Sequence, residues 1–162
     1  MEEKKKIWDS GKSVSLTLVI AWLFAAALLI CMIIAPFVIP NWFTFRYTDG
    51  DNEYKALYSY AYVVIAAFYI CCPAGICCIA SLIKLLTNIK KDIVFVPANI
   101  KLLRILSWCC FFVTAVSFVS SFFYIPFAIV FASSGFLGLI LRVVKNVMAR
   151  ATEIKNENDL TI

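Results

Sequence analysis

Histidine is absent from this chain of 162 residues, which removes the side chain that most often serves as a general base and as a metal ligand. Charged residues are also scarce, and none lies in the central part of any of the long apolar segments. Ionisable groups inside a membrane usually mark proton relays and ion paths, because they are costly to keep in lipid. Their absence argues against a proton-coupled transporter and against an intramembrane hydrolase, so we expect no enzymatic activity.

Cysteine, by contrast, occurs seven times, always within apolar runs. An odd number with adjacent pairs is unlike a set of extracellular disulfides. Cys77-Cys78 and Cys109-Cys110 are predicted at similar depth, where four thiolates could hold a soft metal. Adjacent residues of a helix point about 100° apart, however, so four thiols do not easily converge. We interpret the cysteines as small packing residues, with lipidation or redox sensing as the alternative, and expect no metal or cofactor.

Apolar residues make up 63% of the chain, whereas soluble domains contain about 45–50%. They are gathered in uncharged runs longer than the ~20 residues that a membrane span needs. We therefore predict an all-α integral membrane protein, a single four-helix bundle. The predicted spans are residues 14–39, 56–83, 105–123 and 126–147.

Prolines mark the expected irregularities of these helices. Pro36 and Pro40 are predicted to mark the fraying end of the first helix, and Pro73 to kink the second. The last uncharged run, residues 105–141, is about twice too long for one span. Tyr124-Ile125-Pro126 lies at its centre and predicts a tight helical hairpin. One bent helix with a re-entrant segment is the alternative.

The distribution of lysine and arginine predicts the orientation in a cell membrane. Thirteen of the fifteen lie in the N-terminal segment, in a loop predicted at 84–104, and near or within a tail predicted at 148–162. Only Arg46 and Lys55 lie on the opposite side. Because cytoplasmic segments are enriched in Lys and Arg, both termini and the middle loop are predicted to be cytoplasmic.

The basic cluster around the middle loop has two interpretations. It enforces the orientation of the helices, or it binds anionic lipid, to which each nearby charge contributes about 1 kcal/mol. Arg142 and Lys145, close to the inner end of the last helix, are expected to reach the headgroups. Direct nucleic-acid binding is poorly supported, since so short a basic loop lacks a reading module. The cluster consists of Lys84, Lys90, Lys91, Lys101 and Arg104.

Small and hydroxylated residues in the last two spans predict close helix packing. Spacings of four between small residues let helices approach, and three hydroxyl residues share one face, from which they could hydrogen-bond across to the last helix. A ligand cavity is the alternative interpretation. The residues concerned are Ala128, Ala132, Ser134 and Gly138 in the last span and Thr114, Ser117 and Ser121 in the third.

Two segments resemble a bacterial membrane protein family known as domain of unknown function twenty-nine seventy-five. They are Ile93 to Arg104, which holds a Phe-x-Pro-x-Asn pattern, and the ending Ala151 to Ile162, which closes on Leu-Thr-Ile. The resemblance implies four spans over nearly the whole chain. It brings no activity, substrate or cofactor. Members are often encoded beside a small helix-turn-helix regulator, which implies a cytosolic DNA-binding protein as partner.

The leading hypothesis is a regulatory or interaction protein that contacts a cytosolic partner through the middle loop and the tail. The alternative is a small transporter, channel or immunity protein acting on a hydrophobic compound, with a cavity lined by Tyr69, Thr114 and Ser117. Oligomerisation is compatible with either. The candidate partner-binding residues are Phe95, Pro97, Asn99, Arg104, Glu157, Asp159 and Leu160.

Overall fold

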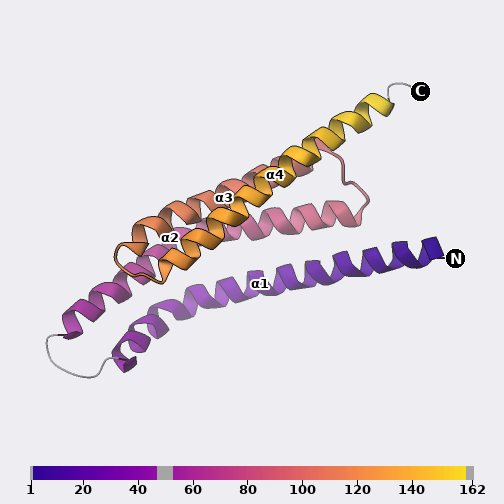
Figure 1. Cartoon of the computed structure of the whole chain (residues 1–162). Helices are drawn as coiled ribbons and strands as arrows, with labels where there is room; N and C mark the ends of the chain where they lie inside the picture. The colour runs from indigo at the N-terminus through magenta and orange to yellow at the C-terminus, as the bar shows by residue number, and fades with distance from the viewer. Residues whose placement is uncertain (1, 47–52, 160–162) are drawn as a thin grey trace.

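The described part of the chain is all-helical and consists of four long helices (Figure 1). A computed structural model describes the backbone of residues 2–46 and 53–159, and the side chains of 12–42 and 60–158. Each helix contains a stretch that is long and apolar enough to cross a membrane. The helices are α1 (Glu2–Arg46), α2 (Glu53–Lys90), α3 (Pro97–Ser121) and α4 (Phe127–Asp159).

The helices are longer than the sequence predicts. The loop expected at 84–104 is only the segment 91–96, because α2 continues to Lys90 and α3 begins at Pro97. The reason is that charged residues mark the edge of the lipid rather than the end of a helix. Leu85, for example, lies beyond Lys84 and is still buried, so the apolar face of α2 continues past the first lysine.

Two prolines also lie inside a helix rather than at its end. α1 runs through Pro36 and Pro40 to Arg46, which corrects the prediction of a helix that frays there. Proline has no N–H, so Pro36 leaves the carbonyl of Met32, four residues earlier, without its usual donor. The hydroxyl of Tyr69 on α2 donates to that carbonyl at 2.6 Å. A side chain of the neighbouring helix thus replaces the missing backbone bond.

The four helices form an open row rather than a closed bundle. Within the described residues, α1 packs on α2, α2 on α3, and α3 on α4, and no other pair of helices is in contact. α1 therefore lies at one edge of the row and α4 at the other. The predicted four-helix membrane architecture thus takes the form of a row, because each helix needs to bury only a narrow face when lipid covers the rest.

The exposed surface is that of a membrane protein. Large apolar side chains point outward all along the helices, among them Ile33 of α1 at 70% exposure and Ile129 of α4 at 73%. Soluble monomers rarely show apolar patches of more than a few hundred Å². Lipid is the solvent in which such a surface is stable.

The start of α1, the 91–96 turn and the end of α4 lie at the same end of the molecule, while the turn from α3 to α4 lies at the other (Figure 1). That second turn is residues 122–126, where the sequence predicts a hairpin. The amides of Phe123 and Tyr124 both donate to the carbonyl of Ser120, at 3.1 and 3.0 Å. Local hydrogen bonds of this kind pair the backbone N–H and C=O groups of the turn at the membrane edge, where an unpaired backbone group is unfavourable in free energy.

Candidate functional site

The turn between α2 and α3 is built around an aspartate in the left-handed region. Asp92 has a φ of 58° and occupies the position after a helix end that glycine usually takes. The amide of Ile93 donates to the carbonyl of Asn88 at 3.0 Å, and that of Asp92 donates to the carbonyl of Ile89 at 3.0 Å. These two bonds form a Schellman motif, which ends α2 and reverses the chain.

α3 then begins at Pro97, as expected for a proline in the first turn of a helix. The preceding residue, Val96, is extended, with φ −134° and ψ 146°, which is the conformation that a following proline favours. Val96 offers no side-chain cap. The turn is held instead by a side chain that lies two residues after the proline.

Asn99 is that side chain, and it is completely buried. Its Nδ2 donates to the carbonyls of Ile93 and Val94, both at 2.8 Å. Its Oδ1 accepts a hydrogen bond of 2.7 Å from Nδ2 of Asn88. The amide is therefore engaged on both sides within the chain. This corrects the prediction that Asn99 contacts a partner: its role in the structure is to hold the turn.

The other predicted partner-binding residues have different surroundings. Phe95 and Pro97 are exposed at the turn and at the start of α3, Arg104 is exposed about two turns further along α3, and Glu157 is exposed near the end of α4. Asp159 is the last residue of α4 and its side chain lies outside the described part, as does Leu160. The structure thus brings together only Phe95 and Pro97 at the turn.

The turn adjoins a buried apolar region between α2 and α3. Four leucines form a buried cluster, with Met148 of α4 packed against it. They join α2 and α3, and so fix the end of the row at which the turn lies. The leucines are Leu85, Leu102, Leu103 and Leu106.

α3 and α4 are in close contact at Gly138. A Cβ at this position would lie 3.2 Å from Cε1 of Phe111 and 3.3 Å from Cβ of Cys110. The hydroxyl of Ser107 donates to the carbonyl of Gly138 at 3.0 Å. One turn earlier, the hydroxyls of Thr114 and Ser134 are 2.9 Å apart. The two helices are therefore joined by polar bonds on both sides of a close contact.

The other predicted packing residues are divided between two environments. Ser117 is buried, whereas the hydroxyl of Ser121 donates to the carbonyl of Phe118 within its own helix. Ala128 and Ala132 are exposed. Their spacing of four matches that of Ser134 and Gly138, but neither alanine is buried against another helix in the described part of the chain. The prediction for this alanine pair is corrected within the single chain.

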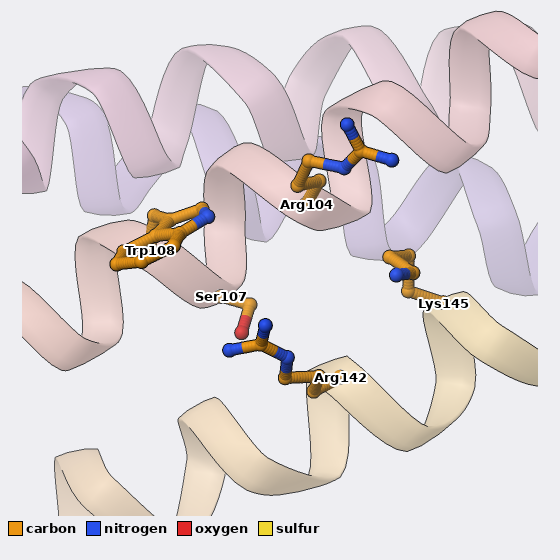
Figure 2. A pocket seen from close by; sticks show the side chains of 5 residues that line it. All are labelled: Arg104, Ser107, Trp108, Arg142 and Lys145. Atoms are coloured by element: carbon orange, nitrogen blue, oxygen red, sulfur yellow. The ribbon is translucent and has the colours of Figure 1, made fainter.

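A cavity of about 300 Å³ opens beside this contact, on the side of the 91–96 turn. Figure 2 shows Arg142 and Lys145 projecting from α4 toward α3, with Ser107 facing Arg142. Arg104 and Trp108 complete the lining from α3. Below, this cavity is called the basic pocket, and its lining residues are Arg104, Ser107, Trp108, Arg142 and Lys145.

The basic pocket combines three cations with no carboxylate. The guanidinium of Arg142 is held by aromatic rings, with Cζ 5.7 Å from the ring centre of Trp108 and 5.9 Å from that of Phe111. Cation–π contacts of this kind contribute about 0.5–2 kcal/mol. Like charges brought together repel one another, so an anion bound among them would be stabilised by all three.

Ser107 and Trp108 were not identified from the sequence as parts of a site. A signal is present: Arg104, Ser107 and Trp108 are spaced i, i+3 and i+4, and so share one face of α3. Arg142 and Lys145 have the same relation on α4. The sequence alone leaves open whether these two faces meet.

The pair Cys77-Cys78 lies on α2 and the pair Cys109-Cys110 on α3. Cys109 lies close to Cys77, as the similar depth predicted for the two pairs suggests. All seven cysteines are free thiols. Within the described residues, no three side chains of metal-ligating type come together.

Residues 44–162 match a protein family whose description reads "Protein of unknown function (DUF2975)". The matched part contains α2, α3 and α4 with both of their turns, and with them the basic pocket. No curated protein and no solved structure matches the chain.

Proposed function

The chain belongs to the DUF2975 family of proteins of unknown function, and we propose that it is a non-enzymatic membrane protein that docks a cytosolic protein. The docking surface is the end of the row that carries the 91–96 turn and the end of α4. In this proposal that end is cytoplasmic and both termini lie inside the cell. The excess of Lys and Arg at this end supports the orientation.

The length of α4 supports a docking surface outside the lipid. Its 33 residues span about 50 Å, whereas the hydrocarbon core is about 30 Å thick. About 13 residues therefore extend into water as a helix. Every residue from 153 to 158 is exposed, so the last part of this extension is not used for packing within the described chain.

Exposed apolar side chains in this region carry the proposal. Ile93 and Phe95 in the turn are 45% and 42% exposed, and Ile154 on the extension of α4 is 58% exposed. Lipid covers such residues along the spans, but not beyond the headgroups. Large apolar residues on a water-facing surface are typical of protein-binding sites. A small helix-turn-helix regulator is the partner class that the family resemblance suggests.

Photo-crosslinking in cells tests this proposal. A photo-reactive phenylalanine analogue replaces Phe95 or Ile154, and Ile125, which is 82% exposed on the 122–126 turn, serves as the control at the opposite end. We expect the same protein to be crosslinked from the first two positions and not from the third. Deletion of residues 156–162 is expected to reduce the crosslink from Phe95. Crosslinks to unrelated proteins at each position, or an undiminished crosslink after the deletion, would contradict the proposal.

The transporter alternative receives less support from the geometry. The hydroxyl of Tyr69 is bonded to Met32 across the α1–α2 contact, while the hydroxyl of Thr114 is 2.9 Å from that of Ser134 at the α3–α4 contact. These two hydroxyls are used in two separate helix contacts. They do not line one polar path between the helices.

A further inference from the structure

The basic pocket is a positively charged concave surface of which the docking proposal makes no use. Between Asp92 and Glu153 the chain has five cations and no carboxylate. Three of the five, Arg104, Arg142 and Lys145, line this one pocket. Charge that served only to orient the helices could be spread along the edge of the membrane. Here it converges from two helices on one cavity.

We propose that the basic pocket binds the phosphate group of an anionic phospholipid in the leaflet on the side of the 91–96 turn. Arginine presents several N–H groups in one plane, which suits phosphate oxygens, and lysine adds a point charge. The contact of Arg142 with Trp108 and Phe111 orients its guanidinium before a ligand arrives. The hydroxyl of Ser107 is already donated to Gly138, so Ser107 forms the floor of the pocket rather than a phosphate donor.

The depth of the pocket favours a lipid over a soluble phosphate. Measured along the helices from the 122–126 turn, Arg104 lies about 26 Å away and Arg142 about 22 Å. The hydrocarbon core is about 30 Å thick, and arginine and lysine side chains reach outward from such depths toward the headgroups. The charged ends therefore lie at the level of lipid phosphates. Trp108, 61% exposed, is the type of residue that is enriched at this level.

Exposed apolar side chains also lie next to the pocket on its membrane side. Phe112 of α3 and Leu139 of α4, about one turn from Trp108 and Arg142 toward the 122–126 turn, are 48% and 57% exposed. The acyl chains of a bound phospholipid can lie along such a surface while the phosphate enters the pocket. A soluble anion would gain nothing from these residues.

Lipid retention by the purified full-length chain tests the proposal. Native mass spectrometry in mild detergent compares phosphatidylglycerol with zwitterionic phosphatidylcholine. We expect preferential retention of phosphatidylglycerol, weakened about tenfold or more in the double variant Arg142→Gln/Lys145→Gln. The matched control is Lys84→Gln/Lys90→Gln, which removes the same charge from exposed positions on α2 near the same end. Equal loss in both double variants, or equal retention of the two lipids, would overturn the proposal.

A second measurement leaves the pocket residues unchanged. In a variant with Trp8, Trp22 and Trp42 replaced by Phe, Trp108 is the sole indole. Brominated phosphatidylglycerol at low mole fraction in phosphatidylcholine nanodiscs is expected to quench its fluorescence more strongly than brominated phosphatidylcholine. Glycerol 3-phosphate in the buffer, at millimolar concentration, is expected to leave the quenching unchanged. Quenching that does not depend on the headgroup, or that the soluble phosphate abolishes, would refute a lipid site.

Discussion

Asn99 shows how one buried amide can determine the path of a turn. Three hydrogen bonds join it to Ile93, Val94 and Asn88. Buried polar groups are stable only when they are paired, so the carbonyls of the turn and the amide of Asn99 depend on one another. The exposed Phe95 is held in place by this arrangement, because it directly follows one of the bonded carbonyls.

Replacement of Asn99 by alanine is expected to lower the free energy of unfolding by about 2–3 kcal/mol, because it leaves several buried polar groups without partners. Unfolding by a rising fraction of sodium dodecyl sulfate, followed by circular dichroism, measures the change. Asn146→Ala serves as the control, since Asn146 is exposed on α4 and its loss should change stability by no more than about 0.5 kcal/mol. A similar effect of both substitutions would show that Asn99 does not hold the turn.

At the residue scale, the sequence is a better guide to where a helix begins or ends than to which groups a side chain contacts. The position of Pro97 at the start of α3 follows from the local chemistry of proline, which needs no neighbour. The role of Asn99 depends instead on where two carbonyls lie after the chain has reversed. The left-handed conformation of Asp92, which sets that reversal, is not predictable from an aspartate alone. The asparagine of the Phe-x-Pro-x-Asn pattern was therefore interpreted as a surface residue.

At the scale of elements, the proline positions and the helix contacts are linked. Pro36 removes a donor from α1, and Tyr69 of α2 supplies one to the carbonyl that is left. The bond is part of the contact between α1 and α2, and it also pairs the carbonyl that the proline leaves without a donor in α1. Its contribution should therefore depend on the presence of the proline.

This dependence can be measured with a double-mutant cycle. Tyr69→Phe is expected to destabilise the chain by about 0.5–1.5 kcal/mol, since it leaves the carbonyl of Met32 unpaired. In a Pro36→Ala background, the backbone N–H restored by the substitution can donate to that carbonyl, and the same Tyr69→Phe change should have little effect. The free energy of unfolding of the four proteins gives the coupling. Equal effects of Tyr69→Phe in both backgrounds would mean that the tyrosine hydroxyl does not compensate for the proline.

Two helical glycines offer a similar comparison of contacts. A Cβ at Gly75 would lie 3.6 Å from Leu28, an ordinary contact, whereas one at Gly138 would lie 3.2 Å from Phe111. Gly75→Ala should stabilise the chain by up to about 1 kcal/mol through helix propensity.

Gly138→Ala should lack this gain, and Gly138→Val should cost about 1–3 kcal/mol because it overpacks the α3–α4 contact. The same detergent titration compares these proteins. Gains of equal size in the two alanine variants would show that α3 and α4 are not in close contact at this point.

The register of α3 against α4 also explains why the basic pocket was not recognised from the sequence. Arg104 and Arg142 lie far apart along the chain, and the sequence placed both near one membrane edge without relating them. They share a cavity because Gly138 allows the backbones to approach beside Ser107. Small-residue spacing alone does not identify the contact, since Ala128 and Ala132 have the same spacing and are exposed.

At the scale of the whole molecule, composition was the best guide. Long uncharged runs predicted four helices, and the structure has four that are apolar enough to cross a membrane. The arrangement of the helices was not predictable in the same way. Run lengths report contact with lipid, but they do not report how many neighbours each helix has. The sequence therefore predicts four membrane helices, but not that they lie in a row.

The orientation of the row is a prediction about the whole molecule. In a variant with all seven native cysteines replaced by serine or alanine, single cysteines are introduced as Lys91→Cys or Ile125→Cys. A membrane-impermeant maleimide is expected to label the cysteine at 125 in intact cells. Labelling at 91 is expected only after the cells are permeabilised, because the positive residues remain inside. The reverse pattern would place the 91–96 turn outside the cell.

The contacts of the row join helices that follow one another in the sequence, and this affects how the protein can assemble during its synthesis. Each helix after the first packs on the one made just before it, and no described contact joins helices that are not consecutive. Structures dominated by local contacts form quickly, and their segments need not wait for later ones. As each new span leaves the insertion machinery, its only partner is already in the bilayer. The nascent chain can thus assemble in the order of its synthesis, with α3 and α4 entering last as a pair joined by the short 122–126 turn.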